Sequence, residues 1–320
     1  MLQVILFIAG FFLLIYGANW LVDGASSIAK KFNISNIVIG LTIVALGTSS
    51  PELVVNLIAS IQGNADVAMG NILGSNISNI FLILGVSALI YPLAVNRGTQ
   101  TKEIPLALLA AIVLGIVAND RLVDGIAESM IRRSDGVVLV AFFILFIHYA
   151  FSIAKHKETK EIPVIRSLPL WKSILLIIAG IGGLVLGGNW IVDGAVFIAL
   201  WAGMREATIS LTIVALGTSL PELATCAVAA YKRNTGIVFG NVIGSNLFNI
   251  FFVLGVSAII KPIPFEAALN YDIIVGILAV FILMIFLFLS KKKILAKWQG
   301  GVFLFLYVIY ITILVLKDLY

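Results

Sequence analysis

Charged side chains are scarce in this sequence. They make up 12% of its 320 residues, against 61% hydrophobic residues, and the mean hydropathy is +1.13. This balance excludes an ordinary water-soluble domain, in which about 25% of the residues are charged. The net charge of +5 is therefore attributed to loops beside lipid, and no nucleic-acid partner is predicted.

Cysteine is almost absent as well. The single residue, Cys226, excludes a disulfide within the chain and any zinc site built from cysteines. No histidine, lysine or arginine is predicted at mid-membrane, and no histidine-based metal motif is present. The sequence therefore predicts no cofactor.

Long apolar runs dominate the sequence instead, and they predict an all-α polytopic membrane protein. The first run lacks the basic flank and the cleavage site of a signal peptide, so it is interpreted as a span. Hydropathy predicts ten transmembrane helices, at roughly 3–22, 35–61, 66–91, 104–119, 135–154, 171–192, 207–231, 236–260, 272–290 and 299–316.

The two halves of the chain repeat each other at an offset of 170 residues. "LTIVALGTSSPEL" (41–53) matches "LTIVALGTSLPEL" (211–223) at 12 of 13 positions, and 70–92 matches 240–262 at 15 of 23. We therefore predict two five-helix repeats, residues 1–153 and 171–320, joined by a cytoplasmic linker at 154–170. Because five is odd, the repeats are inverted, as in many secondary transporters.

The distribution of lysine and arginine predicts the orientation. With the N-terminus outside, 15 of these residues lie in inside loops and 6 lie outside. The positive-inside rule therefore favours both termini outside the cell membrane.

Two glutamates carry the strongest functional signal. Of the 16 acidic residues, only Glu52 and Glu222 lie near the middle of predicted spans. A carboxylate at that depth costs about 2.5–3.5 kcal/mol on insertion scales, so such residues usually face an internal cavity and have a function. A structural, hydrogen-bonded role for both is the alternative, which their symmetric placement disfavours.

Each glutamate follows a proline that interrupts its helix. Pro51 and Pro221 lack an N–H group, so carbonyls near Gly47 and Gly217 are expected to lose their helical partners. Irregular backbone at this depth is tolerated where it lines a cavity. The neighbouring hydroxyls add further oxygen donors; they belong to Thr48, Ser49, Thr218 and Ser219.

A polar stripe marks the third and eighth spans. Its residues recur every four positions, so they share one helix face; they are Asn71, Ser75 and Asn79, with Asn241, Ser245 and Asn249 in the second repeat. Asn79 and Asn249 are predicted ligands. Asn71 and Asn241 either bind ions or only join helices. An all-oxygen set of this kind suits calcium and sodium and does not suit zinc or copper.

The paired "GTS-PE" and "GN..GSN..N" segments resemble the two alpha-repeats of sodium/calcium exchangers, in the cation/calcium antiporter superfamily. The resemblance extends over both halves of the chain. It implies that the broken second and seventh spans form the site against the third and eighth. It also implies alternating access, driven by sliding of the first and sixth spans.

The resemblance further implies a ligand set. Glu52 and Glu222 would hold calcium with backbone oxygens of Thr48 and Thr218. The sodium sites would add the hydroxyls of two serine pairs and two backbone carbonyls, which belong to Ser49, Ser219, Ser75, Ser245, Ala45 and Ala215.

One residue departs from the family pattern. Close archaeal relatives and the potassium-dependent branch carry an aspartate where this chain has Asn249, which by resemblance argues against a potassium requirement.

The predicted function is electrogenic exchange of about three sodium ions for one calcium ion. Proton/calcium exchange is the alternative, disfavoured because "GNILG" and "GNVIG" contain no glutamate. A membrane hydrolase or a passive channel would leave the repeated oxygens or the inverted repeats unexplained. No oligomeric state is predicted.

Overall fold

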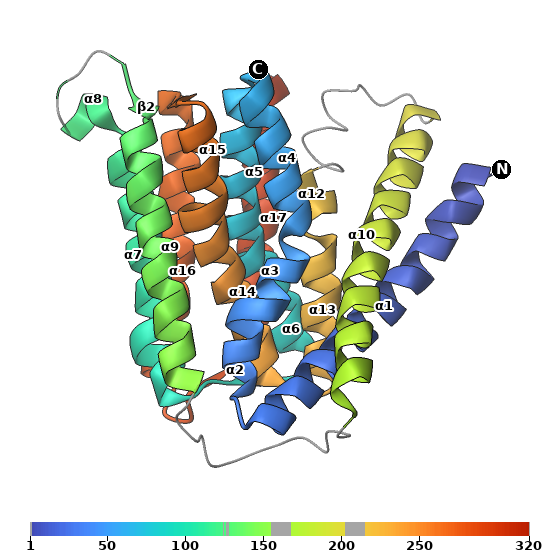
Figure 1. The fold of residues 1–320 in the computed structure, drawn as a ribbon. Coiled ribbons are helices and arrows are strands. Elements are labelled where there is room, and N and C mark those ends of the chain that lie inside the picture. The colour runs from blue at the N-terminus through green and yellow to red at the C-terminus, as the bar shows by residue number, and fades with distance from the viewer. Residues whose placement is uncertain (1, 124, 126–127, 155–167, 202–214, 320) are drawn as a thin grey trace.

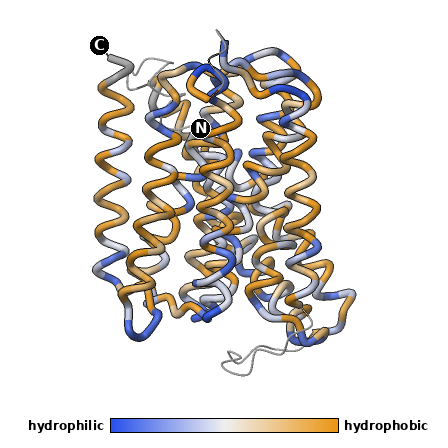
Figure 2. The backbone as a smooth tube through the Cα atoms, turned by 90° about the vertical axis from the view of Figure 1, so that its left-hand side faces the viewer, coloured by the Kyte–Doolittle hydropathy of each residue, from blue (hydrophilic) through white to orange (hydrophobic). Residues whose placement is uncertain are grey.

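The protein is a bundle of long helices, seen here in a computed structural model (Figure 1). The structure describes residues 2–123, 125, 128–154, 168–201 and 215–319. Hydrophilic positions gather at the two ends of the bundle, and apolar positions occupy the length between them (Figure 2). This distribution is typical of a protein that crosses a membrane.

The first half forms five groups of helices. The first span is one long helix, and the second and third are divided into shorter α and π segments. Their bounds are α1 (Leu2–Phe32); α2 (Asn36–Ile39), η1 (Gly40–Val44), α3 (Ala45–Thr48) and α4 (Ser50–Gln62); α5 (Ala65–Ser78), η2 (Asn79–Ile83) and α6 (Leu84–Ile90); η3 (Thr99–Glu103), α7 (Ile104–Val117) and α8 (Asp120–Val123); and α9 (Arg133–Ala154).

The second half follows the same order. Its bounds are α10 (Leu170–Trp201); α12 (Ala215–Thr218) and α13 (Leu220–Tyr231); α14 (Thr235–Leu247), η5 (Phe248–Leu254) and α15 (Gly255–Ile260); η6 (Ala267–Leu269) and α16 (Asn270–Leu289); and α17 (Lys297–Leu319). Most of the predicted linker, 154–170, and the start of the predicted seventh span, 207–214, lie outside the described residues.

Eight or nine of the ten predicted spans are found among the described residues. Within the described residues, eight helices are long and apolar enough to cross a membrane. A ninth span is the bent pair Asn36–Thr48 and Ser50–Gln62, with 48° between its halves. The remaining predicted span is described only from Ala215 onward, so ten stays a prediction.

Two short antiparallel strand pairs tie one half of the chain to the other. β1 (Leu93–Ala94) pairs with β4 (Ile294–Leu295), and β2 (Met130–Ile131) pairs with β3 (Ile263–Pro264). In each pair, the segment after the third span of one half meets the segment before the fifth span of the other. α6 lies toward the bottom of the molecule and α15, its equivalent, toward the top (Figure 1).

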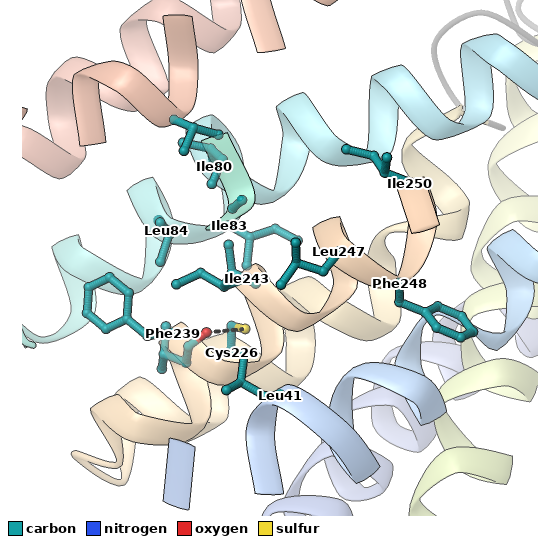
Figure 3. Close-up of a cluster of buried hydrophobic side chains, with 14 of the residues drawn as sticks. Leu41, Ile80, Ile83, Leu84, Cys226, Phe239, Ile243, Leu247, Phe248 and Ile250 are labelled. Carbon is teal, nitrogen blue, oxygen red and sulfur yellow. Dashed lines mark hydrogen bonds between the residues drawn. The ribbon is translucent and has the colours of Figure 1, made fainter. Parts of the chain in front are cut away.

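The third and eighth spans form the centre of the bundle. In each, 78% of the most hydrophobic stretch is buried, against 22–39% for the other continuous spans. Buried apolar side chains from η1, η2, α13, α14 and η5 meet around them (Figure 3). Polar residues on these two spans are therefore shielded from lipid.

α1 and α10 approach each other closely along a line of glycines. Glycines recur every seven residues along the contact, at Gly10, Gly17 and Gly24 of α1 and Gly180, Gly187 and Gly194 of α10. A Cβ added to Gly17 would lie 2.9 Å from the carbonyl oxygen of Gly180. Small residues of this kind let membrane helices pack backbone against backbone, so the two helices form one closely packed unit.

Gly180→Ala tests this close packing. The new Cβ would lie 2.6 Å from the backbone nitrogen of Leu21, which cannot move without moving α1. We expect a loss of about 1–3 kcal/mol of stability, as for other overpacked sites, seen as earlier thermal unfolding in detergent. Gly182→Ala is the control, because its Cβ would meet nothing within 4 Å. Equal melting temperatures for the two variants would contradict the close contact.

Candidate cation site

The second and seventh spans break at equivalent serines. Ser49 has φ −82° and ψ 12°, and Ser219 has φ −84° and ψ 1°, so neither is helical. The following helices, α4 and α13, each carry proline in the first turn, where the missing N–H costs nothing. The break therefore sets each glutamate in the first turn of a new helix inside the bundle.

The carbonyl of Gly47 has no helical partner, as expected before Pro51, but a side chain takes its place. The Ser50 hydroxyl donates to it over 2.7 Å, and so replaces the hydrogen bond that Pro51 cannot make. Leu220 stands at the equivalent position of the second repeat and has no hydroxyl. The two halves of the site therefore differ in their backbone support.

Glu52 and Glu222 lie together in the centre of the bundle. Each side chain is 1% exposed, and the two carboxylates are close enough to interact electrostatically. Each is near hydroxyls of the other repeat: Thr218 lies beside Glu52, and Ser49 and Thr48 lie beside Glu222. The site is therefore shared between the repeats.

Ser49 shows how this sharing works. The spacing of Ser49 and Glu52 matches a capping box, in which serine would bond within its own helix. Its side chain makes no such bond. Instead the hydroxyl lies 2.9 Å from Oε1 of Glu222 and 2.9 Å from Oγ of Ser245. Ser49 can therefore donate to Glu222 and accept from Ser245.

An amide network joins the third span to the eighth. Asn79 donates to Oδ1 of Asn246 over 2.8 Å, and Asn249 donates to Oδ1 of Asn76 over 3.1 Å. Asn79 begins the π-helix η2, and Asn249 lies in the π-helix η5; such π segments are frequent at functional sites. The network fixes the amide nitrogens, and Oδ1 of Asn79 and Asn249 has no partner among the residues that the structure describes.

Asn71 and Asn241 connect the site to its surroundings. Asn71 donates to Oδ1 of Asn56 over 2.9 Å and to the carbonyl of Glu52 over 3.2 Å. Asn241 accepts from Thr48 over 3.0 Å and donates to the buried Cys226 sulfur over 3.2 Å. Both residues join helices, which agrees with one of the two roles left open for them.

Several buried oxygens of the predicted ligands have no hydrogen-bond partner within the described residues. They are Oε2 of Glu52 and Glu222, Oγ of Ser75 and Ser219, and Oδ1 of Asn79 and Asn249. Buried polar atoms are normally satisfied, so orphaned oxygens around two carboxylates favour a bound cation. Calcium takes six to eight oxygens in flexible geometry, and this set suits it.

Other predicted residues lie at the same break. Thr48 is buried and its hydroxyl is 3.4 Å from the carbonyl oxygen of Ala45, which also accepts from the Ser49 N–H. Ala215 and Thr218 bound the short helix α12. Sequence reasoning missed Asn56, Asn76 and Asn246. The repeated "GSN" triplets were an available signal for the last two.

Ser49→Ala and Ser50→Ala make a matched pair of variants. Ser49 contacts a site carboxylate, whereas the Ser50 hydroxyl bonds to the carbonyls of Leu46 and Gly47 in its own span. Because a hydrogen bond to a charged group contributes about 1.5–3 kcal/mol, we expect Ser49→Ala to raise the half-saturating cation concentration about tenfold. Ser50→Ala should change it less than twofold. Cation-dependent thermal shifts measure both, and equal effects would remove Ser49 from the site.

Comparison with known proteins agrees with this geometry. The chain matches the profile of the sodium/calcium exchanger protein family over residues 2–152 and 172–316. It is 37% identical to the inner membrane protein YrbG of Escherichia coli over 301 residues, 89% of each chain. It is 29% identical to the sodium/calcium exchanger MaX1 of Methanosarcina acetivorans over 342 residues, 97% of each chain.

Among solved structures, the chain resembles the sodium-calcium exchanger NCX_Mj. The TM-score is 0.84 at 37% identity, with 97% of this chain and 98% of that chain covered. The family resemblance predicted from the repeated motifs is thereby confirmed. The protein is a membrane-spanning member of the sodium/calcium exchanger family.

Proposed function

We propose that this protein exchanges sodium for calcium across the cell membrane by alternating access. The observation that carries the proposal is the pair of buried glutamates, Glu52 and Glu222, together with other buried oxygens of the predicted ligands that find no partner in the described part of the chain. Family membership and the names of NCX_Mj and MaX1 support the choice of ions.

The electrostatics of the pair explain why transport would be an exchange. Two carboxylates in a low dielectric repel each other, so the site is unfavourable without a cation. One calcium ion neutralises the pair, and several sodium ions do the same while using the hydroxyls and carbonyls as separate cages. The protein therefore changes the side to which the site opens only when the site holds either calcium or sodium.

The proposed ligands are those that the resemblance to the family implies. Calcium is held by the two glutamates and the backbone oxygens of Thr48 and Thr218. Three sodium ions share the glutamates with the remaining oxygens, which belong to Ser49, Ser219, Ser75, Ser245, Asn79, Asn249, Ala45 and Ala215. Asn249 supplies an oxygen without a charge, so we propose that potassium is not required.

The proposed architecture has ten spans in two inverted five-helix repeats, 1–153 and 171–320, with the linker 154–170 on the cytoplasmic side. Both termini lie outside. The crossed strand pairing β1–β4 and β2–β3 supports inversion, because each repeat makes the same contact at the opposite end of the molecule. The helices α1 and α10 are the proposed sliding unit.

The testing experiment is calcium uptake into sodium-loaded liposomes that contain the protein. Radioactive calcium is added in sodium-free or sodium-containing buffer, with and without potassium. We expect uptake only with internal sodium, suppressed by external sodium and indifferent to potassium. Uptake driven only by a pH gradient would replace the proposal by proton/calcium exchange. No calcium flux under either gradient would refute calcium transport.

A further inference from the structure

The loop after α13 contains a strained residue. Arg233 has φ 59°, the left-handed conformation that side chains seldom adopt. The equivalent residue of the first repeat is Gly63, with φ 80°. Glycine adopts this conformation without strain, so the arginine in the second repeat is the residue that needs an explanation. Retained strain of this kind is a reason to look for a function.

Three consecutive residues at this turn contact α1 or the end of α6. Lys232 Nζ lies 2.7 Å from Oδ1 of Asp23 in α1. The guanidinium of Arg233 lies 5.6 Å from the ring centre of Tyr91, at the end of α6. Asn234 donates to the hydroxyl of Ser26 in α1 over 3.0 Å.

The Asn234 contact is held at both ends. Its Oδ1 also caps α14 by accepting from the N–H of Ile237 over 3.3 Å. α1 is therefore joined to the end of α13 and to the start of α14. Asp23 of α1 takes part in this joint through its ion pair with Lys232.

The first repeat cannot build these contacts at the opposite end of the molecule. Its turn is Gln62, Gly63 and Asn64, and the positions equivalent to Asp23, Tyr91 and Ser26 are Asp193, Lys261 and Val196. Glutamine carries no charge for Asp193, glycine has no side chain, and valine cannot accept a hydrogen bond. Lys261 Nζ would lie 2.6 Å from a Cβ at Gly63, so an arginine there would meet a cation.

The packing of the helices also differs between the two ends of the molecule. α1 lies along α13, whereas α10 makes no comparable contact with α4 within the described residues. On the outer side of α4, Val54 and Ile58 are 53% and 50% exposed. Their equivalents in α13, Ala224 and Val228, are partly buried. The bundle is closed more tightly at the α13 end.

We infer that Lys232, Arg233 and Asn234 form a latch that closes the α13 end of the ion path. The inference rests on the proposed alternating access, in which α1 must leave α13 for the site to open at that end. The latch favours the conformation open toward the α4 end, the side of the N-terminus. The two sides of the membrane therefore differ in apparent calcium affinity.

The exposure of the Lys232–Asp23 ion pair sets the size of the effect expected when the pair is removed. The side chains of Lys232 and Asp23 are 28% and 55% exposed, and exposed ion pairs contribute little individually. We expect removal of the ion pair to shift the conformational equilibrium about two- to fivefold. An apparent affinity scales with the population of the binding-competent state, so the two sides must change in opposite directions.

The test compares calcium half-saturation from the two sides, in right-side-out and inside-out vesicles. Lys232→Gln copies the first repeat and should lower the constant at the α13 end and raise it at the α4 end. The ratio of the constants should change two- to fivefold. Arg233→Gly should act in the same direction while relieving strain. A ratio unchanged in both variants, or equal changes on both sides, would overturn the latch.

Gln62→Lys is the mirror control, because it offers Asp193 a cation at the opposite end. It should shift the ratio the other way, and a shift in the same direction as Lys232→Gln would contradict the inference.

A second measurement needs no transport, so it separates failure of the latch from failure of the proposed function. Hydrogen exchange of residues 19–32 in detergent should accelerate in Lys232→Gln and not in Gln62→Lys. Unchanged exchange would overturn the latch even if sodium-driven uptake is found.

Discussion

Glu52→Gln and Glu222→Gln are each expected to reduce sodium-driven calcium uptake at least 100-fold. Glutamine keeps the size and one oxygen of the side chain, so the change is almost purely one of charge. With one carboxylate left, a calcium ion in the buried site retains an uncompensated charge. Breaking a buried charge pair costs about 3–5 kcal/mol, which exceeds the 2.7 kcal/mol of about a 100-fold change.

Stability measurements distinguish this loss from misfolding. Without cations, either variant should unfold at the same or a higher temperature than the native protein, because the repulsion between the carboxylates is gone. Calcium should raise the unfolding temperature of the native protein by mass action and leave that of the variants unchanged. Glu266→Gln, on an exposed loop residue, is the control and should behave as native. Calcium uptake near the native rate in Glu52→Gln or Glu222→Gln would remove that residue from the site.

Membrane potential is expected to change the calcium gradient that the protein sustains by about 50-fold per 100 mV. Two carboxylates with one calcium ion are neutral, whereas with three sodium ions they carry one positive charge. One charge that crosses the membrane is worth about 2.3 kcal/mol per 100 mV, and each 1.4 kcal/mol is about tenfold. Net positive charge moves with sodium, so a positive potential on the side that sodium enters should oppose calcium uptake.

Liposomes with an imposed potassium diffusion potential measure this effect. The initial rate and the final calcium level are followed at several potentials with a constant sodium gradient. A control without ionophore separates potential from potassium itself. Uptake independent of potential would exclude three-to-one exchange and favour an electroneutral two-to-one cycle.

Much of the site could be predicted because its signals are local. A glutamate in the middle of an apolar run is costly wherever the chain folds, and a proline before it interrupts any helix. Both features occur twice in nearly identical segments around Glu52 and Glu222. Hydropathy alone located the spans, because the length of a membrane helix is set by the bilayer.

Contacts between distant segments could not be predicted. The spacing of Ser49 and Glu52 matches a local capping box, yet the Ser49 hydroxyl bonds to Glu222. The repeated "GSN" triplets draw attention to Asn76 and Asn246, but they do not show that these residues bond to Asn249 and Asn79 of the other repeat. Such bonds depend on which helices cross at the centre.

The amino-acid sequence by itself determined that this protein lies in a membrane, that its halves repeat and that two carboxylates lie inside it. Those conclusions rest on transfer energies and helix geometry, which act on each segment separately. Only the tertiary structure decided how the repeats share one site and why its ends differ. The difference between Lys232 and Gln62 has meaning only where Asp23 lies 2.7 Å away, because a charge stabilises a fold through its partner.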